Sequence, residues 1–343
     1  MTAMSRALKQ RFLIVAAITT LLFLAGIILL PGIGAYADEV RAQSEPDPQS
    51  PAVNHDTWTA GAPIPTAVSQ ETAAALKNEI YVIGGIASTG FTAEVQIYNP
   101  TTNAWTTGVP LPMPIAAASS AVVKNILYVF GGSNAPQTWT NAVWAFNPKT
   151  KSWTSMAPMP TARELSGAVV ENNIVYVMGG DQGNNVFLPT VESYNPATDT
   201  WTEEAPLLSS KQGPAVGRIG TALIASDGAA SPGEITGDTE SYNASKNAWA
   251  ELTPDPKARA YACGGAIGAS FYEAGGYLND GGAATALNHS LKPSKNQWTT
   301  TLAPMPQGTM LGASAVLKGK LYCIGGWATW GGSSINNLQI YQP

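Results

Sequence analysis

Residues 161–201 read TARELSGAVVENNIVYVMGGDQGNNVFLPTVESYNPATDTW, and this stretch contains the pattern that decides the fold. A run of small residues meets a polar turn, and an aromatic, β-branched run then ends at Gly179-Gly180. A loop leads to a third run that ends near Tyr194, and a further turn precedes a fourth run with Trp201. Short β-rich runs separated by turn residues predict four antiparallel strands.

The same unit recurs along most of the chain. A tryptophan returns at intervals of about 48 residues, at Trp58, Trp105, Trp153, Trp201, Trp249 and Trp298. A pair of small residues returns with it, at Gly84-Gly85, Gly131-Gly132, Gly179-Gly180, Asp227-Gly228, Gly275-Gly276 and Gly325-Gly326. A large apolar residue lies seven positions before five of the tryptophans, at Tyr98, Phe146, Tyr194, Tyr242 and Leu291. A period near fifty residues predicts a repeat architecture.

The glycine pair, tyrosine and tryptophan together resemble the kelch repeat, and the resemblance covers residues 55–343. It implies an all-β, six-bladed β-propeller with four-stranded antiparallel blades. Asp227 replaces the first glycine of one repeat, which an aspartate in a left-handed conformation allows. Very small residues in each first strand suit six strands crowded around one axis. The sixth repeat ends before any tryptophan, so the strand around Trp58 is expected to close the ring as the outer strand of the last blade.

The amino terminus is expected to be a separate segment. Basic residues precede an apolar run at 12–30, and Ala35-Tyr36-Ala37 follows it. We interpret residues 1–37 as a signal peptide or an uncleaved signal anchor. The apolar run is long for a cleaved signal peptide, and its length is close to that needed to span a bilayer. Residues 38–54 are polar and proline-rich, which predicts a flexible tether. These features predict an extracytoplasmic propeller, either secreted or held at the membrane by this segment alone.

Composition excludes several function classes. The net charge is −5 and only 12% of residues are charged, so nucleic acid is not an expected partner. The chain has two histidines and no recognisable metal, phosphate-loop or nucleophile motif, so we expect no metal and no cofactor. A monomeric propeller is expected. For Cys263 and Cys323 we favour buried free thiols, with an inter-blade disulfide as the alternative.

Three consecutive repeats place a cation at one position, seventeen residues before the second glycine of the pair: Arg163, Lys211 and Arg259. Because the three positions are structurally equivalent, they predict a basic arc around one mouth of the central channel. Arg218 is expected to lie deeper in the channel. Such an arc would bind an anionic ligand, an acidic carbohydrate or an acidic peptide. The alternative is that these cations pair with nearby carboxylates and connect loops, with Glu164, Asp181, Asp255 and Glu273 as candidates.

Five aromatic residues lie in or beside the loops that follow the glycine pairs: Trp139, Phe187, Tyr277, Trp327 and Trp330. Aromatic rings beside polar groups suit sugar stacking or protein contacts, and packing between blades is the alternative. The run Asp181–Asn185 lacks the spacing of a calcium loop and is interpreted as a turn. Glu273 occupies a strand position that holds valine or cysteine in four other repeats, so it is either paired or a general base.

Two functions remain, and the first is favoured. One is an exported, non-enzymatic module that binds a ligand or protein partner on a single loop face. The other is a sugar-acting enzyme, because the fold resembles the six-bladed bacterial sialic acid mutarotases, with Glu164 or Glu273 as acid or base. No catalytic motif of that family matches here residue by residue, so the second function depends on fold and charge alone.

Overall fold

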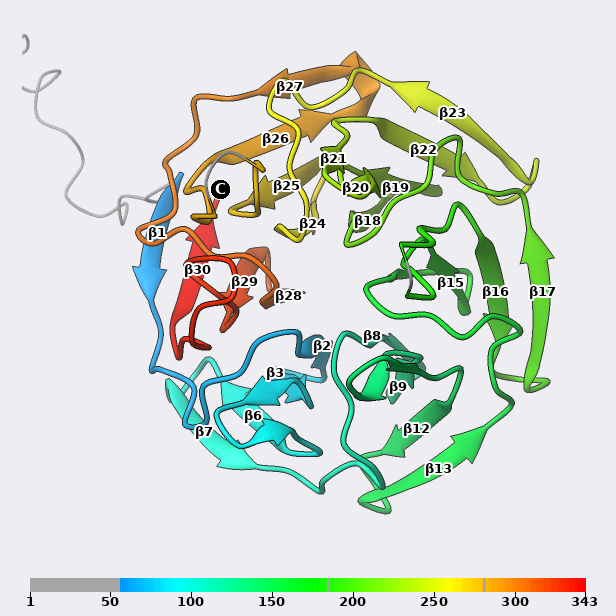
Figure 1. Ribbon diagram of the computed structural model, residues 1–343, viewed down its shortest axis with the longest axis vertical. Coiled ribbons are helices and arrows are strands. Elements are labelled where there is room, and N and C mark those ends of the chain that lie inside the picture. Colours follow the sequence, from blue (N-terminus) through cyan, green and yellow to red (C-terminus); the bar gives the residue numbers. More distant parts are fainter. Residues whose placement is uncertain (1–55, 184, 280–281) are drawn as a thin grey trace, which may run out of the picture. The chain divides into compact units, whose positions relative to one another are not determined.

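The computed structural model describes residues 56–343 except 184, 280 and 281 (Figure 1). The expected signal segment, 1–37, and tether, 38–54, lie outside the described residues. None of the helices in the described part of the chain has the length and apolar character that crossing a membrane requires.

Six four-stranded antiparallel sheets are arranged as blades around a central axis (Figure 1), as the sequence predicts. The blades are, from the inner strand outward: β2 (Thr72–Leu76), β3 (Glu79–Ile83), β6 (Val95–Asn99) and β7 (Ala104–Thr107); β8 (Ser119–Val123), β9 (Ile126–Phe130), β12 (Val143–Asn147) and β13 (Ser152–Met156); β14 (Gly167–Glu171), β15 (Ile174–Met178), β16 (Val191–Asn195) and β17 (Thr200–Glu204); β18 (Ala215–Ile219), β19 (Ala222–Ser226), β22 (Thr239–Asn243) and β23 (Ala248–Leu252); β24 (Cys263–Ile267), β25 (Ser270–Ala274), β26 (Asn288–Lys292) and β27 (Gln297–Thr299); and β28 (Ala313–Leu317), β29 (Lys320–Ile324), β30 (Leu338–Gln342) and β1 (Thr57–Ala60). Short hairpins extend three of the loops between second and third strands: β4 (Ile86–Ala87) with β5 (Gly90–Phe91), β10 (Ser133–Ala135) with β11 (Thr138–Trp139), and β20 (Ala229–Ser231) with β21 (Glu234–Ile235).

The tyrosine–tryptophan spacing produces a repeated contact between the third and fourth strands. Tyr194 pairs directly with Trp201 across β16 and β17, and their ring centroids lie 4.9 Å apart. The indole N–H of Trp201 donates to the carbonyl of Ala157, just beyond the outer strand of the preceding blade, at 2.9 Å. All six repeat tryptophans make the equivalent bond. The tryptophan therefore packs its own blade and links it to the one before.

The glycine pairs turn the chain where backbones of adjacent blades approach closely. Gly179 and Gly180 have φ of 68° and 92°, and a Cβ on Gly179 would lie 2.4 Å from the carbonyl oxygen of Lys211 in the next blade. The N–H of Gly180 donates to the carbonyl of Lys211 in the next blade, at 2.8 Å. Asp227, in place of a first glycine, adopts a φ of 59°, so its predicted left-handed conformation is confirmed.

A closed ring of backbone hydrogen bonds, which we call the waist, surrounds the channel. In each blade the residue two positions before the start of the inner strand donates its N–H to the carbonyl of the equivalent residue in the preceding blade, at 2.6–3.1 Å. The members are Gln70, Ala117, Leu165, Gly213, Tyr261 and Leu311. Every member has φ between 52° and 63°, and five of them are not glycine. The left-handed conformation costs a non-glycine residue about 1–2 kcal/mol, so the six bonds hold the backbone in a strained geometry.

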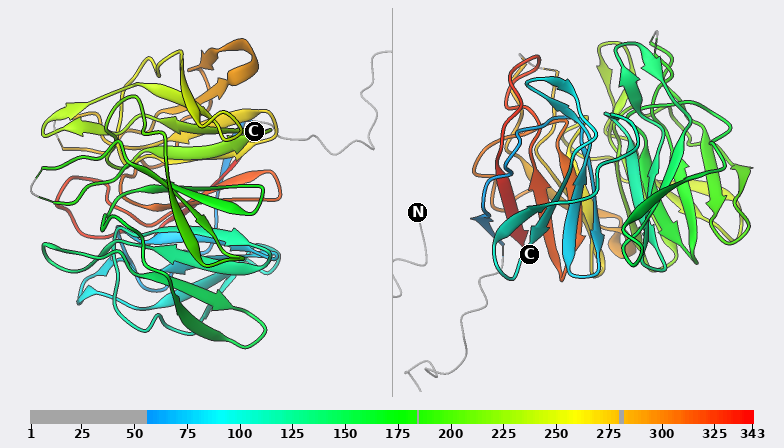
Figure 2. Two further views of the ribbon diagram at one scale, coloured as in Figure 1. Left: turned by 90° about the vertical axis from the view of Figure 1, so that its right-hand side faces the viewer. Right: turned by 90° about the horizontal axis from the view of Figure 1, so that it is seen from below.

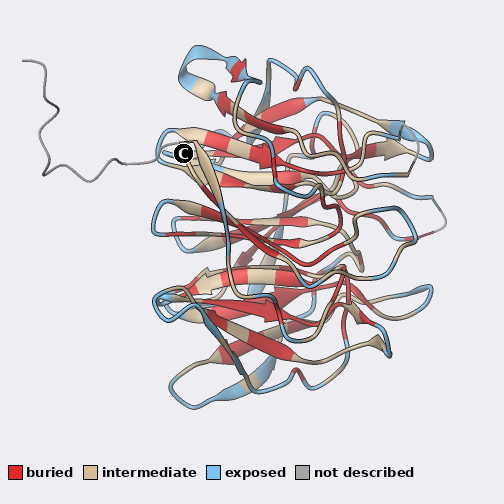
Figure 3. Ribbon diagram, turned by 90° about the vertical axis from the view of Figure 1, so that its left-hand side faces the viewer, coloured by how far each residue is buried: buried red, intermediate tan, exposed pale blue. Residues whose placement is uncertain are grey.

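The core lies between adjacent blades. Buried side chains of neighbouring sheets form successive apolar clusters around the ring, whose blades Figure 2 shows from the side. Exposed residues gather in the fourth strands and in many of the connecting loops (Figure 3). Between the last two blades this packing includes a disulfide from Cys263 on β24 to Cys323 on β29, with 5.7 Å between the Cα atoms. The favoured prediction of free thiols is therefore wrong, and the alternative holds, because β24 packs against β29 of the next blade and brings the two cysteines within bonding distance.

Candidate functional site

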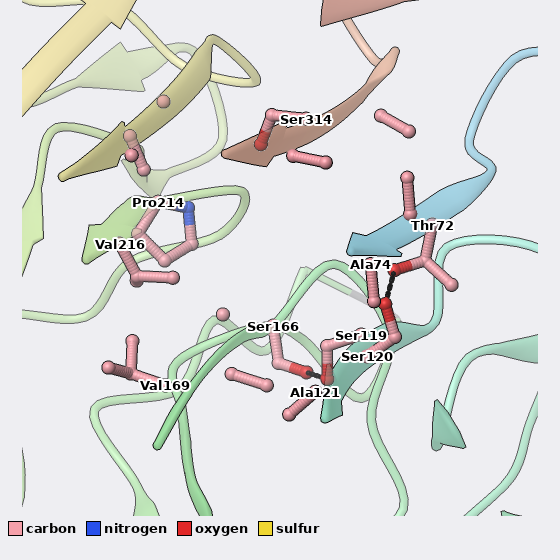
Figure 4. Close-up of a pocket in the computed structure, with 18 of the residues that line it drawn as sticks. Thr72, Ala74, Ser119, Ser120, Ala121, Ser166, Val169, Pro214, Val216 and Ser314 are labelled. Atoms are coloured by element: carbon pink, nitrogen blue, oxygen red, sulfur yellow. Dashed lines mark hydrogen bonds between the residues drawn. The ribbon is translucent and has the colours of Figure 1, made fainter. Parts of the chain in front are cut away.

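The central channel is lined by the six inner strands and encloses about 470 Å³. Its wall consists mostly of alanine, serine, glycine and valine, as the small first strands predict (Figure 4). Hydroxyl groups bond across neighbouring blades, Thr72 to Ser120 at 2.7 Å and Ser119 to Ser166 at 3.1 Å. Arg218 lies along this channel rather than with the other cations, and it pairs with Glu171 at 3.1 Å. The channel thus offers hydroxyl groups and one paired cation, Arg218, for recognition.

A second space, which we call the mouth hollow, opens beyond the waist on the face of the glycine pairs. It measures about 520 Å³, and Gln70, Leu165, Tyr261 and Leu311 of the waist line both it and the channel. Each blade makes a short bridge between the residue after the glycine pair and the loop entering the inner strand, and residues of these bridges in the third to sixth blades line the hollow. Glu164 with Asp181 is one of these bridges, with backbone bonds of 3.0 and 2.9 Å.

The third, fourth and fifth blades supply the polar half of the mouth hollow. Asp181 accepts a hydrogen bond from the side-chain amide of Gln212, and the carbonyl of that amide accepts one from the hydroxyl of Tyr261. The backbone N–H of Gly183 also donates to Asp181, at 2.6 Å. Glu164 lies beside this chain of bonds, half-buried in the same wall. A carboxylate, an amide and a phenol are therefore held in fixed positions.

Burial governs the acid–base properties of these groups. It raises the pKa of Glu164; a hydrogen bond from Ser133 opposes this change, and the charge of Asp181 adds to it. Burial also raises the pKa of Asp181, opposed by the bonds from Gln212 and Gly183. The pKa of Tyr261 is raised first by burial and then by the charge of Asp181, so its hydroxyl remains a donor. Burial therefore raises the pKa of both carboxyl groups in this polar wall.

The fifth and sixth blades supply the aromatic half. The ring of Trp330 is 51% exposed and lies 5.1 Å from Tyr277 and 5.7 Å from Tyr261, centroid to centroid. Trp327 stands edge-on to Trp330 at 6.0 Å, and Phe187 lines the hollow from the third blade. Four of the five predicted aromatic residues thus line one space.

Trp139, the fifth predicted aromatic residue, does not line the hollow. Its indole packs directly against Gly183, where an added Cβ would overlap the ring. Trp139 therefore supports the loop that contains Asp181 from outside the hollow, which is the packing role left open as the alternative. The run Asp181–Asn185 forms a turn, as interpreted, but Asp181 itself belongs to the polar wall.

The predicted basic arc is not exposed on the surface. Arg163, Lys211 and Arg259 do occupy equivalent positions, because the carbonyl of each accepts a hydrogen bond from the second glycine of the preceding blade. Their side chains, however, point into the blades and are 0% exposed. Arg163 pairs with Glu192 at 2.7 Å and Lys211 with Glu240 at 3.3 Å.

Arg259 makes a larger set of contacts. Its Nη2 lies 2.6 Å from Asp255 and 2.6 Å from His289 Nδ1, and its Nε lies 3.4 Å from Asp227. The alternative of paired cations therefore describes the structure; among the candidate partners, Asp255 forms an ion pair with Arg259, and the charge of Glu273 also acts on it. The third strands supply the others, which no local spacing reveals. Glu273 is also 0% exposed and does not line the hollow, so it cannot reach a ligand there.

Sequence reasoning missed Gln212 and Tyr261 and mistook the role of Asp181. The missed signal lies one residue beyond the cation position. At that next position stand Glu164 and Gln212, whose side chains face the hollow, whereas the preceding side chain faces the core. In an extended segment successive side chains point to opposite sides, so a shift of one residue exchanges buried for exposed.

Six four-stranded antiparallel blades, with recurring glycine pairs, tyrosines and tryptophans, define a kelch-type β-propeller. The sequence matches the Attractin/LZTR1 beta-propeller family over residues 52–231, just over half of the chain. The chain belongs to this family.

Other comparisons describe the fold alone. The solved structure of YjhT superimposes with a TM-score of 0.70 at 22% sequence identity, over 80% of this chain and 95% of that one. No curated protein matches the sequence significantly.

Proposed function

We propose that this propeller is a binding module that holds a neutral, hydroxyl-rich ligand, of the carbohydrate class, in the mouth hollow. The observation that carries the proposal is the division of one space into two halves. Asp181, Gln212 and Tyr261 form a fixed hydrogen-bonding wall, and Trp330 with Tyr277 forms an aromatic wall. A sugar ring needs both, because its hydroxyl groups require hydrogen bonds and its C–H faces stack on aromatic rings.

The charge of the described lining favours a neutral ligand over an anionic one. Glu164, Asp181 and Glu234 line the hollow, and no Lys, Arg or His is among the described residues that do so. An acidic sugar or peptide would meet repulsion there, because the cations that suggested an anion are enclosed in the blades. The proposed ligand class therefore differs from the anionic class that the sequence suggests.

Titration of the protein with neutral oligosaccharides, followed by calorimetry and tryptophan fluorescence, tests this proposal. We expect Trp330→Ala to weaken binding about tenfold or more, because truncating a central aromatic contact costs about 1.4 kcal/mol or more. Leu208→Ala is the matched control: Leu208 is 55% exposed and lies outside the hollow. Equal binding by wild type and Trp330→Ala, or binding of acidic sugars only, would contradict the proposal and direct the search to protein partners.

A sugar-acting enzyme is the second candidate, and Glu164 favours it. A half-buried carboxyl group with a raised pKa, next to a second carboxylate, can transfer a proton to or from a bound sugar. Glu164→Gln keeps the shape and removes the proton transfer. Loss of turnover with binding retained supports the enzyme, and unchanged ligand behaviour supports the module.

A further inference from the structure

The junction between the fourth and fifth blades departs from the repeat pattern at three positions. Asp227 stands where five blades have the first glycine of the pair, and Glu273 stands where the others have valine, alanine or cysteine. His289 occupies the third-strand position that holds Glu192 and Glu240 in the two preceding blades. All three departures meet around one buried cation, Arg259.

Three carboxyl groups converge in this junction. One oxygen each of Asp227, Asp255 and Glu273 lies within 4.8 Å of the other two, and the three residues are 0%, 4% and 0% exposed. They come from separate parts of the fold: Asp227 follows β19, Asp255 lies in the loop before β24, and Glu273 is on β25. The three carboxyl groups are therefore brought together by the tertiary fold, and no sequence motif indicates that they meet.

The charges in this group do not balance. The third and fourth blades match one cation with one carboxylate, Arg163 with Glu192 and Lys211 with Glu240. Here three carboxyl groups face the single guanidinium of Arg259, which leaves two negative charges when all are ionised. Burying carboxylates without compensation is strongly unfavourable, so something must supply positive charge.

Oxygens that face the centre of the group remain available. Arg259 bonds Asp255 Oδ2 and approaches Asp227 Oδ2, while His289 bonds Asp255 Oδ1. Neither oxygen of Glu273 accepts a hydrogen bond of normal geometry from a donor among the described residues, although its side chain interacts with the carboxyl group of Asp227, the hydroxyl group of Ser226 and the charge of Arg259. Asp227 Oδ1 likewise has no donor. A fully buried carboxyl group that lacks a well-placed donor and is directed at two other carboxyl groups is the arrangement expected of a ligand set.

From this arrangement we infer that Asp227, Asp255 and Glu273 bind one hard divalent cation between the fourth and fifth blades. Carboxylate oxygens alone select Ca²⁺, Mg²⁺ or Mn²⁺ over softer metals, and a double positive charge neutralises the excess left by Arg259. His289, bonded to Asp255 at 2.7 Å, orients that carboxylate from behind. Because Ala229, two residues beyond Asp227, lines the mouth hollow, the cation would also fix the wall of the hollow.

The repeat pattern provides the variant that tests this site. Asp227→Gly with Glu273→Val restores the residues that the other blades carry, and Asp227 already has a φ that glycine favours. Folding is therefore expected to persist. Glu203→Gln with Glu251→Gln removes two exposed carboxylates on outer strands and serves as the matched control.

The experiment combines metal content with thermal unfolding. Each protein is treated with EDTA, incubated with Ca²⁺, Mg²⁺ or Mn²⁺, desalted and analysed by mass spectrometry for metal. We expect one metal ion per chain and a higher melting temperature for wild type and the control pair, and neither for Asp227→Gly/Glu273→Val. Terbium luminescence sensitised by tryptophan, lost on addition of Ca²⁺, gives an independent readout.

Two results would overturn the inference. One is an absence of bound metal and of any melting shift in wild type, together with stability that rises as pH falls from 8 to 5; protons would then supply the positive charge. The other is an equal metal response in wild type and Asp227→Gly/Glu273→Val, which would place the metal elsewhere. Sugar binding is not used in either readout, so this test does not depend on the proposed function.

Discussion

Glu71 provides the sharpest test of the electrostatics of this propeller. The residue follows the waist in the first blade and is 5% exposed, where the equivalent residues of other blades are small, such as Ala118 and Gly312. The backbone N–H of Ala313 donates to its Oε1 at 3.2 Å, and its Oε2 has no partner. Burial raises the pKa of Glu71 to about 8 from the model-peptide value of 4.5, opposed by hydrogen bonds from backbone amides.

The sign of the effect follows from proton linkage. Between pH 4.5 and 8 the folded protein holds a proton on Glu71 that the unfolded chain has lost. The contribution of Glu71 to the free energy of unfolding is therefore fully present below pH 4.5. It decreases by about 1.4 kcal/mol per pH unit as pH rises from 4.5 to 8. From pH 5 to pH 8 this amounts to about 3–4 kcal/mol, a large fraction of the net stability of a domain.

Glu71→Gln removes the titration and retains an oxygen acceptor for Ala313. Denaturant unfolding at pH 5, 6.5 and 8 should show that the free energy of unfolding of the variant, relative to wild type, increases by about 3–4 kcal/mol from the lowest to the highest pH. The exposed Glu251→Gln is the control and should follow wild type throughout. Parallel curves for wild type and Glu71→Gln would refute the reasoning, since they would mean that Glu71 has the same pKa in both states.

Three further predictions concern the links within and between blades. Replacing Cys263 and Cys323 by alanine should cost about 4 kcal/mol, as expected for a cross-link over 60 residues, and an unchanged denaturation midpoint would contradict this. Arg163→Met should cost about 3–5 kcal/mol, because it leaves Glu192 buried without a partner, and adding Glu192→Met should recover part of the loss; a single variant with wild-type stability would contradict the pairing. Gly84→Ala should destabilise by more than about 1 kcal/mol, because its φ is 65° and the new Cβ would lie 2.3 Å from a carbonyl oxygen, so an unaltered melting temperature would exclude that contact.

The sequence predicted the architecture because each marker has a local physical role. A tyrosine seven residues before a tryptophan spans a four-residue turn, so the pair meets across neighbouring strands, as Tyr242 and Trp249 do. The glycine pairs must stand where backbones approach closely, and even Asp227 was interpretable from its ability to adopt a left-handed φ. Such constraints act within one repeat and recur in the next, so they are visible in the sequence.

The candidate site was only partly predictable because it depends on side-chain direction and on contacts between repeats. The loops with Phe187, Tyr277 and Trp330 were identified correctly, since loops after the glycine pairs must share one face. Whether Arg163 or its neighbour Glu164 faces the hollow depends on backbone dihedral angles that the spacing does not encode. The group around Glu273 was equally hidden, because its members lie up to 46 residues apart in sequence.

The waist has a consequence for how the number of repeats can change. In an open array of repeats each unit contacts only its neighbours, so copies are gained or lost one at a time. Here every repeat donates one bond backward and accepts one from the repeat ahead, and the circuit is complete only when the sixth meets the first. Deletion or duplication of a single repeat would leave a donor and an acceptor facing across a gap, beside residues such as Leu165 and Leu311 in left-handed conformations that nothing then compensates. The number of repeats in this chain is therefore determined by closure of the whole ring. Relatives are expected to differ in loop length and sequence rather than in the number of blades.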